Sequence, residues 1–310
     1  MSIGDHVVYS PRSWADIGPH VFPMEKYEGV YRRLKAEDEL VSVREPGPPP
    51  DEDLLRVHSR AYLEDLASGR HTPRTEASEL PLSAEIAAFF RFACAGTTLA
   101  ARTALVRGWA VHLGGGFHHA FPEKAEGFCY LNDLAVAARA VQADGSAERV
   151  TVIDLDVHQG NGTAAIFQDD PSVYTFSVHQ EDNYPVKQRS NRDIGLVSFD
   201  PARPGTPWVD DALYLETLDE ALPEVLEASR PDLVLYQAGA DPYEQDQLGA
   251  FRLTRMGLRR RDEAVYRACR ERAVPVAATF GGGYAIEVAD TIAIHLETVR
   301  AARRTLGGAA

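Results

Sequence analysis

Short apolar runs alternate along the chain with longer segments in which apolar residues recur at helical spacing. The runs are rich in valine, isoleucine and alanine, and this composition is typical of strands buried on both faces. The expected strands are 6–10, 39–43, 109–113, 150–156, 172–178, 232–237 and 274–280. The expected helices begin near residue 25 and at the cap Asp51, and then span 61–67, 83–106, 131–142, 163–168, 212–228, 254–272 and 286–303.

This alternation predicts an α/β fold with a mostly parallel central sheet and helices on both faces. No repeat or low-complexity block interrupts it, and the proline-rich stretch 45–50 is too short for an interdomain linker. We therefore expect residues 1–310 to form a single domain. The segment 181–207 is long, polar and interrupted by proline and glycine, which predicts a functional loop.

Four of the expected strands end in loops that carry reactive or glycine-rich sequence. In a parallel sheet the carboxyl ends of the strands lie along one edge, where α/β proteins bind their ligands. We therefore expect the four loops to meet, although more than 160 residues separate the first from the last. These loops are 114–119, 154–162, 239–241 and 281–284.

The most informative of these loops continues the apolar run that begins at Val150. Asp154, Asp156 and His158 occupy alternate positions, which point to the same side of an extended chain. Ionisable groups at the end of a buried strand are costly unless they are paired or bound to a metal. Oxygen and nitrogen donors of this kind suit a divalent cation such as zinc. One strand cannot complete such a site, so the rest of the chain must supply another ligand.

Composition narrows the classes of function. Among 310 residues, 45% are hydrophobic and 25% are charged, which is ordinary for a soluble globular protein. The net charge of −14 argues against direct nucleic-acid binding; it could favour cationic substrates, although acidic residues also serve solubility alone. No apolar run approaches ~18 residues and no secretory signal is visible, so we expect no membrane span. Three widely spaced cysteines fit a reducing cytoplasm.

Five motifs, taken together and in this order, resemble the histone deacetylase family of the arginase/deacetylase fold. They cover most of the chain from about residue 83 onward. The compact length and the segment Phe22-Pro-Met-Glu-Lys-Tyr27 look most like the class IV branch and its bacterial relatives. The motifs are Gly115-Gly-Phe-His-His119-Ala, Gly127-Phe-Cys-Tyr-Leu-Asn-Asp133, Asp154-Leu-Asp-Val-His158-Gln-Gly-Asn161-Gly, Gln237-Ala-Gly-Ala-Asp241 and Gly281-Gly-Gly-Tyr284.

The resemblance implies a zinc ion that activates a water molecule. Its protein ligands would be Asp156, His158 and Asp241, and three ligands with an open position are the catalytic arrangement. By the same analogy His119 is the general base and then the acid that protonates the leaving amine. Tyr284 would donate a hydrogen bond to the developing oxyanion.

The resemblance also assigns supporting roles. His118 would be an electrostatic partner oriented by Asp154, and Asn161 would orient His119 where some family members have an aspartate. Gly127, Phe128 and Tyr184 would contact the substrate, the two aromatic rings forming the walls of the acyl-lysine channel. Asp154 and Ser177 match the potassium site of the family.

These assignments predict a zinc-dependent amidohydrolase that removes acetyl or longer acyl groups from lysine side chains of proteins. An alternative is a deacetylase of acetylpolyamines or other small amides, and a further one is a non-catalytic acyl-lysine binder. A ureohydrolase with two manganese ions would need more bridging carboxylates. We expect acyl chains longer than acetyl, including fatty acyl groups, to be accepted as well, unless Phe22, Met24 or Trp14 closes the floor of the pocket. The sequence leaves the oligomeric state undetermined.

Overall fold

The computed structural model describes residues 3–40, 42–198, 205 and 207–307. They build a seven-stranded sheet with the order β1-β2-β7-β6-β3-β4-β5, and every neighbouring pair of strands is parallel. The α/β fold class with a central parallel sheet is therefore confirmed. The strands are β1 Val7–Val8, β2 Trp109–His112, β3 Val150–Asp154, β4 Val173–Gln180, β5 Arg192–Leu196, β6 Leu233–Gln237 and β7 Val276–Thr279.

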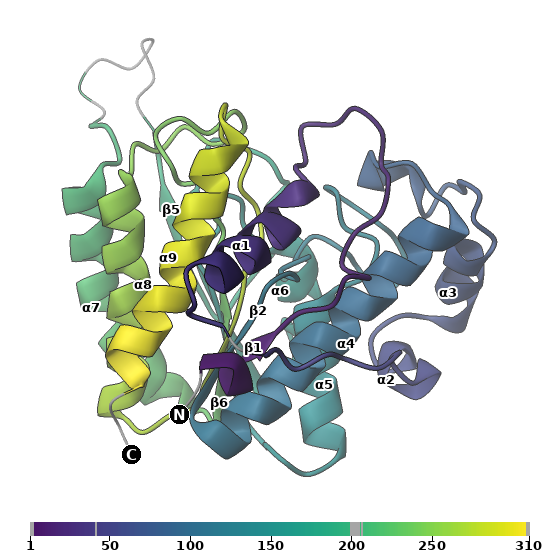
Figure 1. Ribbon diagram of the computed structural model, residues 1–310, viewed down its shortest axis with the longest axis horizontal. Helices are drawn as coiled ribbons and strands as arrows, with labels where there is room; N and C mark the ends of the chain where they lie inside the picture. The colour runs from purple at the N-terminus through teal and green to yellow at the C-terminus, as the bar shows by residue number, and fades with distance from the viewer. Residues whose placement is uncertain (1–2, 41, 199–204, 206, 308–310) are drawn as a thin grey trace.

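Helices cover both faces of the sheet, as Figure 1 shows. The helices α4 and α5 pack together on one side, while α7, α8 and α9 pack in sequence on the other and α1 lies across α9. The helices are α1 Glu25–Ala36, α2 Asp51–Leu55, α3 Arg60–Ala67, α4 Ala84–Arg107, α5 Asp133–Ala143, α6 Asn161–Phe167, α7 Asp211–Ser229, α8 Arg255–Glu271 and α9 Val288–Leu306, with short 3₁₀ helices at Ile3–His6 and Glu76–Ser78.

Polar caps fix the starts of several helices, because a side-chain oxygen satisfies a backbone N–H group that has no partner within the helix. Ser83 accepts a hydrogen bond from the amide of Ile86 at the start of α4, and Thr254 accepts one from Gly257 at the start of α8. The expectation that Asp51 caps a helix is wrong. Pro50 holds the cap position, and Asp51 is the first residue of α2, where its carboxylate pairs with Arg91.

The central helix α4 is apolar around most of its circumference. By length and composition it could cross a membrane, but 67% of its most apolar window is buried inside the protein. It packs against α5 and against strands β2 and β7. This burial explains the apolar sequence, because a helix covered on several sides needs no polar face.

The two ends of the sheet differ most from the sequence prediction. The expected strand 6–10 is reduced to Val7–Val8, and 39–43 forms no strand among its described residues, residue 41 lying outside them. The chain instead touches β1 through one bridge between Val8 and Arg44. The strand β5 lies inside the segment predicted as a loop; it is a polar edge strand, so it lacks the apolar run that marks a buried one.

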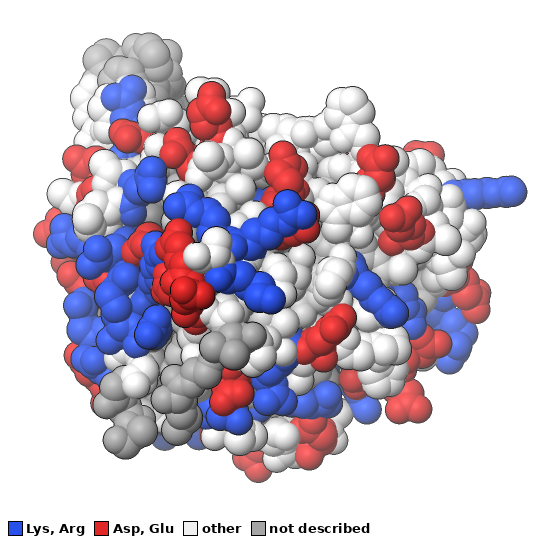
Figure 2. All heavy atoms as spheres, viewed as in Figure 1, with Lys and Arg blue, Asp and Glu red and all other residues white. Residues whose placement is uncertain are grey.

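Charges of both signs alternate on the face drawn in Figure 2. Arginines of α8 and α9 gather there, but many of them pair with acidic side chains. Arg304 contacts both Glu263 and Glu297, and Arg300 contacts Glu39. The pairing largely neutralises this face, and exposed pairs of this kind add little to stability.

The order of the strands determines where a ligand can bind. From β3 the chain proceeds outward through β4 and β5, and then returns to place β6 on the opposite side of β3. The carboxyl ends of β3 and β6 therefore flank a point where the order of the strands reverses, which is where open α/β sheets form a crevice. The loops after β2 and β7 lie at the same edge.

Candidate active site

The strand β3 ends at Asp154, so strand alternation is not what brings Asp154, Asp156 and His158 together. Side-chain hydrogen bonds to the backbone shape the loop instead. The carboxylate of Asp154 accepts from the amide of Asp156 at 3.2 Å, and that of Asp156 accepts from the amide of His158 at 3.0 Å. Each aspartate thus turns the chain two residues ahead of itself, as such side chains do in tight turns.

Asp156, His158 and Asp241 form a buried cluster whose donor atoms all lie within 4.8 Å of one another. The Nδ1 atom of His158 lies 3.1 Å from a carboxylate oxygen of Asp156 and 3.2 Å from one of Asp241. The remaining carboxylate oxygens accept hydrogen bonds from the backbone or from an amide side chain. The donors are the side chain of Gln237 and the amides of Gly282 and Val157.

The electrostatics of this cluster favour a bound cation. Burial lowers the pKa of His158, but its hydrogen bonds to Asp156 and Asp241 outweigh that effect and raise the pKa to about 10. Burial and the charge of Asp156 raise the pKa of Asp241 to about 8. No lysine or arginine forms an ion pair with either carboxylate within the described ranges. The charged neighbours of the two carboxylates are His118 and His158. A histidine that binds a metal must be neutral, so a cation at this site would replace the proton of His158 and balance both carboxylates.

The adjacent histidines His118 and His119 lie beside this cluster and bind different partners. The Nδ1 atom of His118 lies 2.6 Å from Asp154, and that of His119 lies 2.8 Å from the side-chain oxygen of Asn161. Burial lowers the pKa of His118, yet the charges of Asp154 and Asp156 raise it to about 9. Burial, with the charges of His118 and His158, holds the pKa of His119 well below its ordinary value. The two rings can therefore hold different protonation states.

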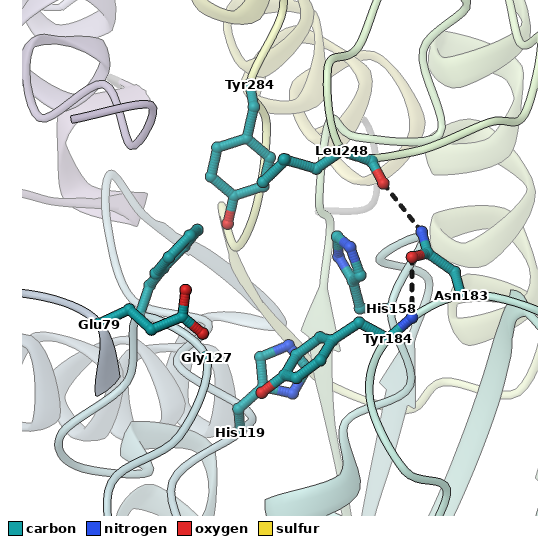
Figure 3. Close-up of a pocket in the computed structure, with 9 residues that line it drawn as sticks. Glu79, His119, Gly127, His158, Asn183, Tyr184, Leu248 and Tyr284 are labelled. Carbon is teal, nitrogen blue, oxygen red and sulfur yellow. Dashed lines mark hydrogen bonds between the residues drawn. The ribbon is translucent and has the colours of Figure 1, made fainter. Parts of the chain in front are cut away.

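A pocket of about 240 Å³ leads from the surface to His119 and His158. Figure 3 shows the ring of Tyr284 at its upper side with the hydroxyl directed into the pocket, and Tyr184 across from it. The Tyr284 hydroxyl forms no hydrogen bond with any residue that the structure describes, so it is free to donate to a ligand. The lining residues are Glu79, His119, Gly127, Phe128, His158, Asn183, Tyr184, Leu248 and Tyr284.

The backbone around Phe128, which lines this pocket, has an unusual conformation. Phe128 has a φ of 62°, which is rare for a residue with a side chain, and its amide donates to the carbonyl of Ser78 at 2.8 Å. Gly127 also has a positive φ, and a Cβ atom there would meet the Tyr184 hydroxyl at 2.6 Å and the His119 ring at 2.7 Å. Strained positions of this kind concentrate at functional sites.

A second space of about 10 Å³, on the order of one water molecule, which we call the inner space of the pocket, shares with it the residues His119, Gly127, Phe128 and Tyr284. Phe22 lines this space and packs against Phe117, Phe128 and Tyr284. Met24 is also buried, whereas Trp14 is 48% exposed. The sequence could not decide which of these three side chains would close the floor; the structure gives this position to Phe22.

Sequence reasoning assigned no role to several polar groups that hold the site. Lys26 is fully buried, donates to the carbonyl of Gly281 at 2.7 Å, and has a pKa lowered by burial to about 8. Gln237 bridges Asp156 and the amide of Gly239. Glu126 accepts a hydrogen bond from Asn161. All three residues lie within or beside the sequence motifs. Only the contacts in the folded structure show that Lys26, Gln237 and Glu126 support the site.

The residues matched to a potassium site are also neighbours. Asp154 and Ser177 face each other across β3 and β4. The hydroxyl of Ser177 lies 2.9 Å from the Nδ1 atom of His179, and Asp154 is bound to His118. The potassium site stays a prediction.

The buried Asp-His-Asp cluster, the two histidines and the tyrosine thus meet at one edge of the sheet, as the resemblance to the arginase/deacetylase fold implied. The crystal structure of the HDA15 HD domain has this fold in common with the chain, with a TM-score of 0.79 at 22% identity over 98% of this chain and 90% of that one. The family model for the histone deacetylase domain matches residues 20–299. The chain therefore belongs to the histone deacetylase family of hydrolases.

Relatives from a cyanobacterium and a plant support this assignment. An uncharacterized protein of Picosynechococcus is 42% identical over 97% of this chain and 99% of its own length. Histone deacetylase 2 of Arabidopsis thaliana is 35% identical over 90% of this chain and 73% of its own length. The resemblance to the class IV branch stays a prediction.

Proposed function

We propose that the protein is a zinc-dependent amidohydrolase that removes acetyl groups from lysine side chains. The observation that carries the proposal is the buried cluster of Asp156, His158 and Asp241 at the inner end of a pocket that also presents His119 and Tyr284. The cluster fits zinc, because it offers one nitrogen and two carboxylate donors with no lysine or arginine pairing to those carboxylates among the described residues. When bound, the ion supplies Lewis acidity toward water and the amide carbonyl.

The side chains of the chain itself supply the proton transfers. The Nδ1 atom of His119 faces the side-chain oxygen of Asn161. With the ring proton on Nδ1, the Nε2 atom would take a proton from water and return it to the leaving amine. His118, held by Asp154, would remain cationic and stabilise negative charge. Tyr284 would donate its hydroxyl proton in a hydrogen bond to the oxyanion.

The shape of the pocket favours acetyl over longer acyl groups. A pocket of about 240 Å³ accommodates an extended lysine side chain, whereas the inner space of about 10 Å³ accepts little more than a methyl group. This observation argues against the fatty acyl substrates that we expected from the sequence. Phe22 would have to move before a longer chain could enter.

A second candidate substrate is an acylated small amine with a positive charge, such as an acetylpolyamine. Glu79 supports it, because its exposed carboxylate lines the pocket and has no hydrogen-bond or ion-pair partner among the described residues. A negative charge at the entrance attracts a cationic substrate. Glu79→Gln should then raise KM for the polyamine about tenfold, because an electrostatic attraction is lost. The KM for a neutral acetyl-lysine peptide should stay within about threefold of the wild-type value.

The function is tested by assaying acetyl-lysine peptides and acetylpolyamines alongside elemental analysis. Wild-type protein should hold about one zinc per chain through its three ligands. Asp241→Ala should lose both zinc and activity, whereas Asp169→Ala, at an exposed aspartate, should lose neither. Metal binding should also raise the melting temperature of the wild type and not that of Asp241→Ala. Full zinc retention and full activity in Asp241→Ala would refute the ligand assignment.

A further inference from the structure

Glu126 connects three parts of the site without lining the pocket itself. One carboxylate oxygen accepts a hydrogen bond from the Asn161 side-chain nitrogen at 2.7 Å and lies 3.4 Å from the Tyr184 hydroxyl. The other accepts from Lys124 at 2.5 Å. The Glu126 side chain is only 17% exposed, so its position is well defined by these contacts.

The contacts of Asn161 fix which way its amide group points. Its nitrogen must face Glu126, because a carboxylate can only accept. Its oxygen then accepts from the backbone amide of Gly162 at 3.0 Å and faces the Nδ1 atom of His119 at 2.8 Å. An amide oxygen also only accepts, so the proton of a neutral His119 ring must be on Nδ1.

We propose that Glu126 is a positioning residue that, acting through Asn161, holds His119 in the tautomer with its proton on Nδ1. That tautomer leaves the Nε2 lone pair free. An asparagine alone could turn its amide group by half a turn and present a donor to His119 instead. The carboxylate of Glu126 opposes this turn together with the backbone amide of Gly162, because the flipped group would place oxygen against oxygen at Glu126 and N–H against N–H at Gly162.

The inference rests on the proposed function for its kinetic consequence, but its central statement concerns a hydrogen position that can be measured directly. Long-range proton–nitrogen correlation spectra of the protein labelled at histidine nitrogens, assigned with His119→Gln, report the tautomer of this ring. In the wild type the proton should be on Nδ1. In Glu126→Ala a second population with the proton on Nε2 should appear, whereas Glu123→Ala, at an exposed glutamate of the same loop, should leave the spectrum unchanged.

Kinetic measurements distinguish a positioning role of Glu126 from a role in packing alone. Glu126→Ala should lower kcat about tenfold, part of the ~10² to 10⁴ that a general base contributes, with KM within about threefold. Glu126→Gln, whose amide oxygen can still accept from Asn161, should restore most of kcat. Because the effect passes through Asn161, Glu126→Ala should cost nothing further in an Asn161→Ala background.

Tyr184→Phe removes the other contact of Glu126 on the pocket side. It should change KM and leave the tautomer of His119 as it is in the wild type. An unchanged tautomer in Glu126→Ala, or additive losses of kcat in the double variant, would overturn the proposal. Absence of amidase activity in the wild type would refute the proposed function instead, and the spectra would still decide the role of Glu126.

Discussion

The hydroxyl of Tyr284 illustrates how the site depends on single atoms. The ring is 7% exposed and packs against Phe22 and Phe128, so its position is set by the core of the pocket. Its amide donates to Asp246 at 2.7 Å, which holds the loop after β7. Burial raises the pKa of Tyr284 well above its ordinary value, so the hydroxyl keeps its proton and can donate it.

Replacing this hydroxyl tests its role without disturbing the packing. Tyr284→Phe should lower kcat by roughly 10² to 10³, the usual cost of losing one oxyanion donor. The melting temperature should be close to that of the wild type, since the ring remains. Tyr174→Phe, on β4, is the matched control and should have full activity. An unchanged kcat in Tyr284→Phe would show that the tyrosine serves packing alone.

At the scale of elements, the floor of the pocket belongs to a segment distant in sequence from the other loops. The chain before α1 passes the inner end of the site and inserts Phe22 there, and α1 then places Lys26 against the loop after β7. The Lys26 ammonium lies 4.8 Å from the centre of the Phe22 ring and 5.7 Å from that of Tyr284. A buried cation against aromatic faces anchors this segment.

Removing the Phe22 ring should widen the accepted range of acyl groups. We expect the wild type to prefer acetyl-lysine over octanoyl-lysine by more than tenfold in kcat/KM, or ~1.4 kcal/mol. Phe22→Ala should reduce that preference at least tenfold, because the vacated space accepts further methylene groups. Trp14→Ala, at an exposed ring, should leave it unchanged. A wild type that prefers octanoyl or myristoyl groups would contradict a closed floor.

At the scale of the whole molecule, buried histidines make stability depend on pH. His58 is buried and lies between two backbone groups: it meets the carbonyl of Phe121 at 3.1 Å, and its Nε2 atom accepts from the amide of Asn132 at 3.1 Å. Protonation would remove that acceptor. Burial lowers the pKa of His58 to about 4, and burial lowers that of His112 to about 3. Both histidines are structural.

The sign of the pH effect follows from these pKa values. Below pH ~6.5, the pKa of an unfolded histidine, the unfolded chain binds a proton at His58 that the folded chain does not bind. The free energy of unfolding therefore falls as the pH falls toward 4. His58 should contribute a loss of about 1.6 kcal/mol between pH 6.5 and pH 5, because the slope approaches ~1.4 kcal/mol per pH unit only below the pKa of the unfolded histidine.

Urea unfolding at both pH values measures this loss. His58→Asn should be less stable at neutral pH but should lose less on acidification, while His71→Asn, at an exposed histidine, should behave as the wild type. Equal acid losses in the wild type and His58→Asn would contradict the buried neutral ring. A cytoplasmic location and the absence of membrane and nucleic-acid contacts stay predictions at this scale.

The amino-acid sequence by itself determined the class of fold and the location of the site. Buried parallel strands need continuous apolar runs and helices need polar caps, so most strands and the starts of α4 and α8 could be predicted within a few residues. Polar groups placed directly after such strands must converge, because parallel strands end at one edge. That rule predicted from the sequence that Asp156, His119 and Tyr284 lie close together.

The tertiary structure alone decided what depends on contacts between distant segments. The edge strand β5 gave no apolar signal, because its pairing with β4 leaves several of its side chains exposed. Whether Phe22 or Trp14 closed the pocket depended on how the chain before α1 crosses the sheet edge. Glu126 could not be separated from an ordinary loop glutamate, because its role arises from the direction of the Asn161 amide. The direction of a hydrogen bond and the volume of a cavity depend on which side chains pack together in the folded chain. The order of residue types along the sequence therefore does not predict them.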